Sequence, residues 1–379
     1  MTAPAIAVVY PGEPRSPAWW AGVPAGLIGG LEELGAQVRA IDARPPRPVA
    51  LAAQLALVPR YLRGALPHPG RVLALADLGP ELGTLRSRVT GRRLRSAEPL
   101  DAVVQIGTDY PLHTSAPVAV LQDRTVQQAL ATGYARWLAL PDGALRTLVE
   151  RQGEAYRRAT ACCTLTPWAA ESVLRDHGVA PGKVHVVGFG PNHVAPPGPR
   201  DWSKPRFLFI GGEWDRKRGD AVVAAFARLR DRIPEARLDV VGGHPPLRGP
   251  GVTGHGNRAA GPAVAGLLGT ATCLVVPSRV EPAGLPYVEA AASGIASIGT
   301  TVGGAAKVIG DAGRAVDPDD DESLFQAMLE LADPDTAREL GERAQERSKL
   351  FTWRAMAARV MRALELPLPP DATGVPPLS

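Results

Sequence analysis

The sequence predicts an α/β protein of two domains, each built on a parallel β-sheet. The chain has 379 residues, which is enough for two domains of ordinary size. Short apolar runs typical of buried strands alternate with helical stretches, and this spacing is typical of βαβ units. The alternation stops at residues 191–205, which contain five prolines, and begins again at Arg206. We therefore expect one domain over residues 1–190, a stiff linker over 191–205 and a second domain over 206–350.

The first domain is expected to begin with a βαβ unit. Residues 6–10 form an apolar run that ends at Pro11-Gly12. A helix is expected from Pro17, a favourable first-turn residue, to Leu34, with Gly35 as its stop signal. The other elements expected in this domain are strands at 38–41, 101–106, 118–121, 161–165 and 183–188 and helices at 51–66, 80–94 and 166–174.

The second domain is expected to open with a strand at 206–210 and an amphipathic helix at 220–232. Residues 249–261 are rich in glycine and are expected to form a loop. The charge run 317–322 is expected to cap a helix before Leu324 rather than to hold a metal. Core candidates in the first helix are Ala224, Phe226, Ala227 and Leu229, and further strands are expected at 238–241, 273–276 and 296–298 and helices at 335–349 and 352–365.

Composition places the chain among soluble globular proteins, with 45% hydrophobic and 21% charged residues. There is no run of eighteen apolar residues, so we expect no membrane-spanning helix. Residues 1–10 lack the basic start of a signal peptide, so a cytoplasmic location is expected. The cysteines Cys162, Cys163 and Cys273 lie in apolar runs, which favours buried thiols over disulfides or a metal site.

The net charge of +4 is spread unevenly along the chain. Residues 1–200 carry 21 Lys and Arg against 15 Asp and Glu. Two interpretations stay open for the arginines at 86–95: a solvated helix face, or a contact with an anionic acceptor or an acidic membrane surface. No nucleic-acid partner is expected, and peripheral membrane contact is left open. These arginines are Arg86, Arg88, Arg92, Arg93 and Arg95.

The centre of the second domain is the stretch 277–294, which follows an apolar strand and leads through a Gly/Pro-rich turn into a helix. A loop that enters a helix N-terminus presents unpaired N–H groups and the positive end of the helix dipole, which suits a phosphate. Two carboxylates flank this turn, Glu281 before it and Glu289 within the helix. Carboxylates next to phosphate-binding amides point to a charged sugar or a nucleotide as ligand.

Glu281 and Glu289, with Gly284-Leu285-Pro286 and residues 290–294 in register, resemble the paired-glutamate motif of retaining GT-B glycosyltransferases of the family 4, or group 1, type. The chain differs at Ala283, where the family usually has Phe. The resemblance implies two doubly wound Rossmann-like domains facing across a cleft, the first for the acceptor and the second for the nucleotide sugar. It also implies a C-terminal helix at 351–366 that crosses back to the first domain. Residues 367–379 are expected to be a disordered tail.

The function implied by the resemblance is transfer of a sugar from a nucleotide-diphosphate sugar, a UDP- or GDP-sugar, to a hydroxyl acceptor with retention at the anomeric carbon. The acceptor would be a sugar, a lipid-linked molecule or a small molecule, and neither a bound metal nor a cofactor is implied. Two alternatives stay open: a nucleotide-sugar 2-epimerase of the same fold, and an inactive partner subunit that binds the donor.

On the donor side, the resemblance assigns the diphosphate to Lys217 and the amides of Gly284 and Leu285. Arg216 precedes this lysine, and Gly211-Gly212 follows the first strand of the domain. Gly212 stands where the family usually has an arginine, so one phosphate ligand is lost unless Arg216 or Arg218 replaces it. Glu281 is expected to orient the sugar and Glu289 to accept from the ribose. Glu281 and Lys217 are the expected catalytic residues.

On the acceptor side, the family usually has a Gly-Gly pair where the first helix begins, and this chain has residues 16–20 instead. Trp19 and Trp20 either pack in the core or form an aromatic platform for an acceptor. Gln122 stands where the family usually has a histidine, and because an amide does not titrate, it is not a general base. Asp123 is the ionisable neighbour, and its alternative role is a helix N-cap.

Overall fold

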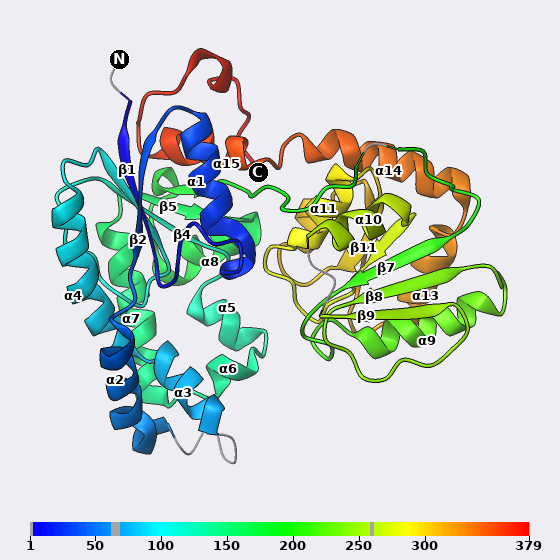
Figure 1. The fold of residues 1–379 in the computed structure, drawn as a ribbon, viewed down its shortest axis with the longest axis horizontal. Helices are drawn as coiled ribbons and strands as arrows, with labels where there is room; N and C mark the ends of the chain where they lie inside the picture. Colours follow the sequence, from blue (N-terminus) through cyan, green and yellow to red (C-terminus); the bar gives the residue numbers. More distant parts are fainter. Residues whose placement is uncertain (1–2, 62–68, 197, 258–260, 379) are drawn as a thin grey trace. The chain divides into compact units, whose positions relative to one another are not determined.

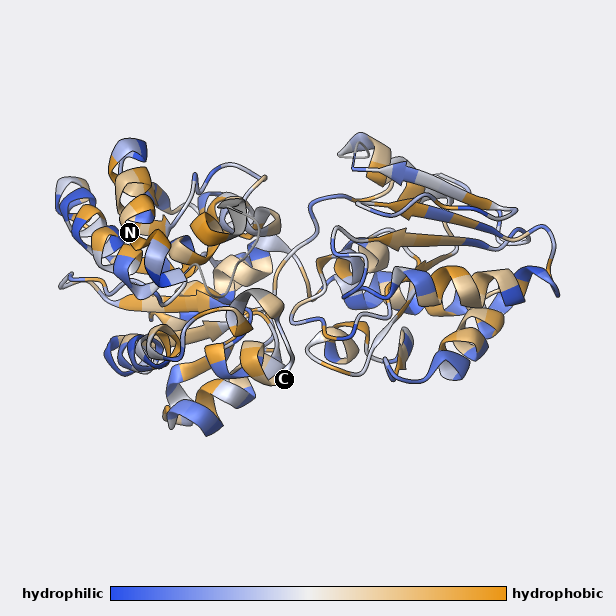
Figure 2. Ribbon diagram, turned by 90° about the horizontal axis from the view of Figure 1, so that it is seen from below, coloured by the Kyte–Doolittle hydropathy of each residue, from blue (hydrophilic) through white to orange (hydrophobic). Residues whose placement is uncertain are grey.

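The computed structural model describes the chain except for residues 1–2, 62–68, 197, 258–260 and 379. The chain forms two compact units, an N-terminal unit of residues 1–189 and 353–379 and a C-terminal unit of residues 190–352. Each unit contains a six-stranded parallel sheet with helices packed against it (Figure 1). The α/β class predicted from the sequence is confirmed. The strands are mostly hydrophobic, whereas the helices mix hydrophobic and hydrophilic residues (Figure 2), as expected for a buried parallel sheet.

The N-terminal sheet has the strand order β2-β1-β3-β4-β5-β6. The chain direction along the sheet reverses after β2, so β1 and β3 flank a topological switch point. In open α/β sheets, ligands bind outside the carboxyl ends of the strands at such a point. The strands are β1 (Ala5–Tyr10), β2 (Gln37–Asp42), β3 (Ala102–Ile106), β4 (Val118–Gln122), β5 (Ala161–Thr164) and β6 (Val184–Val186).

The first helix begins later than the sequence predicts. Helix α1 spans Val23–Glu33 and follows a short 3-10 turn, Trp20–Gly22. The φ angles of Trp20, Ala21 and Gly22 are 43°, 51° and 77°, which belong to the left-handed region and prevent a continuous helix from Pro17. Both tryptophans therefore lie in the loop after β1. The following helices of the unit are α2 (Arg47–Tyr61), α3 (Pro69–Leu78), α4 (Pro80–Ala97), α5 (Val126–Ala131), α6 (Ala135–Leu138), α7 (Asp142–Arg158) and α8 (Pro167–His177).

The last helix, α15 (Trp353–Ala363), belongs to the N-terminal unit and packs on α1. Gly26 of α1 makes room for this contact, because a Cβ there would lie 2.3 Å from the Trp353 ring. The disordered tail expected at 367–379 is not what the structure shows for residues 367–378. Arginines of α15 hold its backbone: Arg359 Nε donates to the Pro376 carbonyl at 2.8 Å, and Arg362 Nη1 donates to the Val375 carbonyl at 2.9 Å.

The C-terminal sheet has the strand order β12-β11-β10-β7-β8-β9. Strand β9 lies within the glycine-rich stretch that was expected to be a loop, because pairing with β8 supplies its backbone hydrogen bonds. Strand β12 has no counterpart in the sequence prediction. The strands are β7 (Arg206–Ile210), β8 (Arg237–Val241), β9 (Val252–Gly256), β10 (Cys273–Val275), β11 (Ala296–Thr300) and β12 (Gly313–Val316).

Helix α9 buries Phe226 and Leu229 as expected, but Ala224 and Ala227 are exposed and Val222 and Ala225 are buried in their place. The predicted cap before Leu324 is confirmed, since Asp320 accepts hydrogen bonds from the amides of residues 322 and 323. The helices of this unit are α9 (Gly219–Arg230), α10 (Pro262–Thr270), α11 (Leu285–Ala292), α12 (Ala305–Ile309), α13 (Asp321–Glu330) and α14 (Pro334–Ser348).

The proline-rich stretch at 191–205, expected to be a linker, belongs to the C-terminal unit and contacts the end of α11. The guanidinium of Arg200 donates to the carbonyls of Gly294 and Ser293 at 2.9 Å each, at the end of α11. The Ala195 amide donates to Ser293 Oγ at 3.0 Å. These contacts satisfy carbonyls that the helix end leaves open, and they fix the stretch beside α11.

Candidate functional site

The turn between β10 and α11 has the strand, turn and helix start predicted from the sequence. Gly284 occupies the N-cap of α11 with φ of 89°, in the left-handed region. A Cβ at this position would also lie 2.3 Å from the Tyr287 ring, so both conformation and space require glycine. The amides that follow it open α11 and are the expected anion contacts.

Glu281 is held in place by its own backbone. Its amide donates to the Val302 carbonyl at 3.0 Å, and its carbonyl accepts from the Gly304 amide at 2.8 Å. A Cβ at Gly303 would lie 2.3 Å from the Glu281 carbonyl oxygen, so the loop after β11 approaches as closely as only glycine permits. The Glu281 carboxylate is therefore positioned by two loops that are distant in sequence.

Cationic groups surround the buried Glu281 carboxylate. Oε2 lies 3.4 Å from Lys217 Nζ and 3.6 Å from Arg216 Nη1, and it accepts from Ser278 Oγ at 3.2 Å. Burial alone would raise the pKa of Glu281, but the charges of Lys217 and Arg216 and the hydrogen bonds from Lys217 and Ser278 outweigh it, so the pKa lies below its usual value. The structure thus brings the two expected catalytic residues, Glu281 and Lys217, into contact. No pattern in the sequence predicted that Ser278 would contact Glu281.

Lys217 reaches this position past Gly211 at the end of β7. A Cβ at Gly211 would lie 2.4 Å from Lys217 Cδ, so the missing side chain provides the space for the lysine stem. Lys217 Nζ also donates to the Ile210 carbonyl at 3.4 Å. The lysine is almost completely buried, with 8% of its surface exposed. Water therefore screens its charge little, and its attraction to a nearby anion is strong.

The two arginines beside Lys217 have different surroundings. Arg216 Nη1 donates to the Val280 carbonyl at 2.8 Å, and its Nε donates to Glu213 at 2.9 Å, so Arg216 lies beside the turn. Arg218 instead forms an ion pair with Asp321 at the start of α13. Arg218 therefore links α9 to α13, and of the two replacements considered for the missing phosphate ligand only Arg216 lies near Glu281.

Gly212 is exposed, and a Cβ at this position would meet no atom within 4 Å. We predict that Gly212→Arg lowers the Kd for a nucleoside diphosphate about tenfold, because a charged hydrogen bond to phosphate is worth about 1.5–3 kcal/mol and ordering the side chain offsets part of it. Isothermal titration calorimetry of both proteins measures the change. Gly212→Gln, which adds length without charge, is the control, and an equal gain in the two variants would contradict the electrostatic explanation.

Glu289 is buried on α11 and already has protein partners. Its Oε1 accepts from the His193 amide at 3.1 Å, from His193 Nδ1 at 2.9 Å and from the Asn192 amide at 3.3 Å. No local pattern in the sequence predicts this contact, because the two segments are separated by 96 residues. The contact between Glu289 and the ribose stays a prediction. We expect Oε2 to make it, because the hydrogen bonds from residues 192–193 all go to Oε1.

The hydrogen bond that His193 donates to the Glu289 carboxylate raises the pKa of His193, and the charge of that carboxylate adds to the effect. Together they outweigh burial, which lowers the pKa, so the pKa lies above its usual value. The contribution of the His193–Glu289 interaction to the stability of the fold is therefore present in full below the pKa of an unfolded histidine, about 6.5. This contribution is lost as the pH rises through the pKa of His193 in the folded protein. We predict that His193→Gln lowers the melting temperature more at pH 5.5 than at pH 8.5. Differential scanning fluorimetry at both pH values checks this, with the exposed His113→Gln as control; an equal loss at both values would contradict it.

The N-terminal unit has a cavity of about 470 Å³ at the carboxyl ends of β1, β3 and β4, beside the switch point of the sheet. It is lined by all four residues expected on the acceptor side. These are Trp19, Trp20, Gln122 and Asp123, and they are joined by Tyr10, Asp77, Arg86, Thr108, Asp109, Arg124, Trp137 and Gln152.

The two tryptophans form an aromatic wall with Tyr10. The Trp20 ring stacks on Tyr10 at 6.5 Å between centroids and 14° between planes, and the Trp19 ring meets Tyr10 edge-on at 6.5 Å. Trp19 is 38% exposed, so the alternative that it packs in the core is wrong. Asp123 is not the N-cap of α5, because Thr125 caps that helix in a capping box with Gln128. Asp123 pairs with Arg124 at 2.9 Å.

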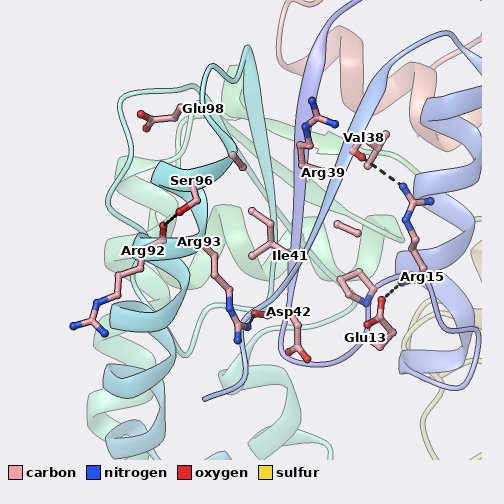
Figure 3. Close-up of a pocket in the computed structure, with 13 residues that line it drawn as sticks. Glu13, Arg15, Val38, Arg39, Ile41, Asp42, Arg92, Arg93, Ser96 and Glu98 are labelled. Carbon is pink, nitrogen blue, oxygen red and sulfur yellow. Dashed lines mark hydrogen bonds between the residues drawn. The ribbon is translucent and has the colours of Figure 1, made fainter. Parts of the chain in front are cut away.

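A larger cavity of about 890 Å³ lies at the edge strand β2 and the end of α4, and it contains none of the expected site residues (Figure 3). Arg93 donates to the Asp42 carbonyl, and Arg15 pairs with Glu32 at 2.7 Å. Exposed arginines on α4 line part of it. Arg86 differs from them, since it is buried and pairs with Asp77 and Asp109. The predicted arginine cluster is therefore not a single surface.

Across the described ranges of the chain, no helix is long and apolar enough to cross a membrane. Within those same ranges, no three His, Cys, Asp or Glu side chains gather as a metal site. The prediction of buried thiols is confirmed, since Cys162, Cys163 and Cys273 are free and buried. Burial raises the pKa of Cys162 to about 11.

Comparison with known proteins supports the resemblance read from the motif. Residues 204–333 match the family model described as Glycosyl transferases group 1. The MMP alpha-(1->4)-mannosyltransferase of Mycolicibacterium hassiacum is 28% identical over 276 residues, 68% of this chain and 65% of that protein. The D-inositol 3-phosphate glycosyltransferase of a Nocardioides species is 28% identical over 66% of this chain and 60% of that protein. The matches thus span less than two thirds of these relatives.

Among solved structures, the sucrose-phosphate synthase of Thermosynechococcus elongatus superposes with a TM-score of 0.66 at 20% identity, covering 96% of this chain and 98% of that one. At this identity the likeness concerns the fold alone. It confirms the GT-B class expected from the sequence.

Proposed function

From the match of its C-terminal unit to the group 1 glycosyl transferases, we propose that this chain transfers a glycosyl group from a UDP- or GDP-sugar to a hydroxyl acceptor, with retention and without a metal in the chemistry. The observation that carries the proposal is the buried Glu281 carboxylate held against Lys217 beside the turn into α11. A carboxylate and an ammonium group at one phosphate-binding turn suit a reaction that separates a sugar cation from a diphosphate.

In the proposed reaction, the acceptor oxygen forms a bond to the anomeric carbon while the bond from that carbon to the donor phosphate oxygen breaks. The acceptor proton passes to the phosphate oxygen that leaves. Lys217 and the amides of Gly284 and Leu285 stabilise the negative charge on the diphosphate, and Glu281 stabilises the positive charge that develops at the sugar. Glu289 Oε2 accepts a hydrogen bond from a ribose hydroxyl, while Oε1 accepts hydrogen bonds from the amides of residues 192–193.

The cavity in the N-terminal unit is the proposed acceptor site. Its aromatic wall suits the apolar face of a sugar ring, and Gln122 offers an amide to a hydroxyl. Asp123 is the ionisable group beside it, and its carboxylate forms an ion pair with Arg124. A sugar, a lipid-linked sugar or a small polyol is the class of acceptor that this lining supports.

Calorimetric titration with UDP, GDP and other nucleoside diphosphates tests the donor site, and one of them should bind. At a hundred times its Kd, such a ligand should stabilise the fold by about 2.7 kcal/mol. An α-linked donor should then give an α-linked product, read from the anomeric proton coupling by NMR. A β-linked product would refute retention, conversion of the donor without an acceptor would indicate the epimerase, and binding without conversion would indicate an inactive subunit.

A further inference from the structure

The acceptor cavity contains a buried hydrogen-bond donor without a partner. Gln122, at the end of β4, is 5% exposed, and its Nε2 has no hydrogen-bond partner among the residues that the structure describes. An unpaired buried donor has lost its hydrogen bonds to water without replacement, so its presence in a cavity calls for a partner from the ligand.

The orientation of this amide follows from a chain of hydrogen bonds that begins at a backbone group. The Val126 amide donates to Gln152 Oε1 at 2.8 Å, and a backbone N–H has no alternative role. Gln152 must therefore present its oxygen to Val126, and its Nε2 donates to Thr108 Oγ1 at 3.0 Å and to Gln122 Oε1 at 3.2 Å. Rotating either amide by half a turn would place two donors against each other. Gln122 Nε2 is thus left as the group that needs an acceptor atom.

Among the described residues that line the cavity, each cation already has a carboxylate. Arg86 Nη1 lies 2.6 Å from Asp109, and its Nη2 lies 2.7 Å from Asp77. Arg124 lies 2.9 Å from Asp123. Three carboxylates thus face two guanidinium groups, and Arg44, which lies over the Trp19 ring, is paired with Asp42. Arg86 Nε is buried and has no hydrogen-bond partner in the part of the chain that the structure describes, but a phosphate placed there would be a third anion against one cation.

We propose that this cavity selects an uncharged, hydroxyl-bearing acceptor over a phosphorylated one, and that Gln152 is a positioning residue that fixes Gln122 as a donor to one acceptor oxygen. The inference rests on the proposed function and narrows its acceptor class. It differs from what the name of the inositol 3-phosphate relative states for that protein. The aromatic wall and the donor amide bind an uncharged sugar, whereas the surplus of carboxylates repels a phosphate.

Saturation-transfer NMR tests this on the full chain with methyl α-glucoside, methyl α-mannoside and their 6-phosphates as probes. We expect at least one uncharged glycoside to bind about tenfold more tightly than its phosphate, a difference of about 1.4 kcal/mol. Tighter binding of the phosphates, or no binding of any probe, would overturn the inference. Binding of nucleoside diphosphates is measured separately by calorimetry, so failure of the acceptor inference and failure of the proposed function give different results.

Variants test the role of Gln152. Gln122→Leu should weaken binding of the uncharged glycoside about two- to tenfold, the value of one neutral hydrogen bond. Gln152→Glu keeps an acceptor oxygen for the Val126 amide, but its second carboxylate oxygen lets the Gln122 amide rotate and donate to residue 152. This variant should therefore weaken binding of the glycoside and leave the affinity for the nucleoside diphosphate unchanged. The double variant should be no weaker than Gln122→Leu alone. Gln127→Leu, on α5 and outside the cavity lining, is the control. Additive losses would show that Gln152 does not act through Gln122.

Discussion

Glu281→Gln is expected to lower kcat about ten- to a thousandfold, which corresponds to about 1.4–4 kcal/mol of lost transition-state stabilisation. The substitution keeps the shape of the side chain and removes its charge. Because positive charge at the sugar develops only as the bond to phosphate breaks, the carboxylate contributes more to the transition state than to donor binding. Steady-state kinetics with the donor identified by calorimetry measure kcat and the donor KM separately.

We also expect Glu281→Gln to lower the stability of the fold, because the carboxylate neutralises Lys217 and Arg216. The lowered pKa of Glu281 means that its contribution to stability is present above the unfolded pKa and is lost as the pH falls through the folded pKa. Kinetics are therefore measured well below the melting temperature of the variant. Glu342→Gln, an exposed position on α14, is the control. An unchanged kcat with a raised donor KM would remove Glu281 from its proposed role.

Lys217→Ala is expected to weaken nucleoside diphosphate binding by about 1.5–3 kcal/mol, or about ten- to 150-fold in Kd. The ammonium group is buried, so its attraction to a phosphate is screened little by water. Calorimetry of the variant measures the loss. The exposed Lys204→Ala in the same unit removes an equal charge elsewhere and should leave the affinity unchanged.

The alanine variant also leaves Glu281 buried with Arg216 as its remaining cationic partner, so we expect a lower melting temperature than for Lys204→Ala. The double variant Lys217→Ala/Glu281→Gln removes both charges and should recover much of this stability without recovering affinity. Recovery of affinity in the double variant would show that Lys217 acts on the donor only through Glu281. An unchanged Kd in Lys217→Ala would remove the lysine from the donor site.

Several parts of the site could be predicted from neighbouring residues alone. The strand before residue 277, the turn at Gly284 and the helix after it depend on an apolar run, a glycine and small helix-forming residues within about twenty positions. The motif also placed Glu281 and Lys217 at two strand ends, and parallel strands bring their carboxyl ends to the same edge of a sheet. That these two side chains touch follows from the adjacency of β7 and β10.

Other parts depend on contacts that no local pattern encodes. Glu289 is bound by residues 192–193, and Arg218 is paired with Asp321 103 residues away. The start of α1 differs from the prediction because residues 20–22 adopt left-handed backbone conformations, which a right-handed helix cannot include.

The sequence by itself determined the two α/β sheets, the glycine-containing turn before α11 and the types of residue beside it, because strand periodicity, turn glycines and helix caps act over a few residues. Only the tertiary structure decided which charges are paired and which polar atom is left over. Among the residues that the structure describes, Gln122 is left with an unpaired Nε2 donor because Val126 and Gln152 fix its amide, with Oε1 accepting from Gln152. The arginines near it are neutralised by Asp77, Asp109 and Asp123. Such pairings depend on the side chains that the folded sheet brings within about 3 Å of one another, and the order of residues along the chain does not contain those distances.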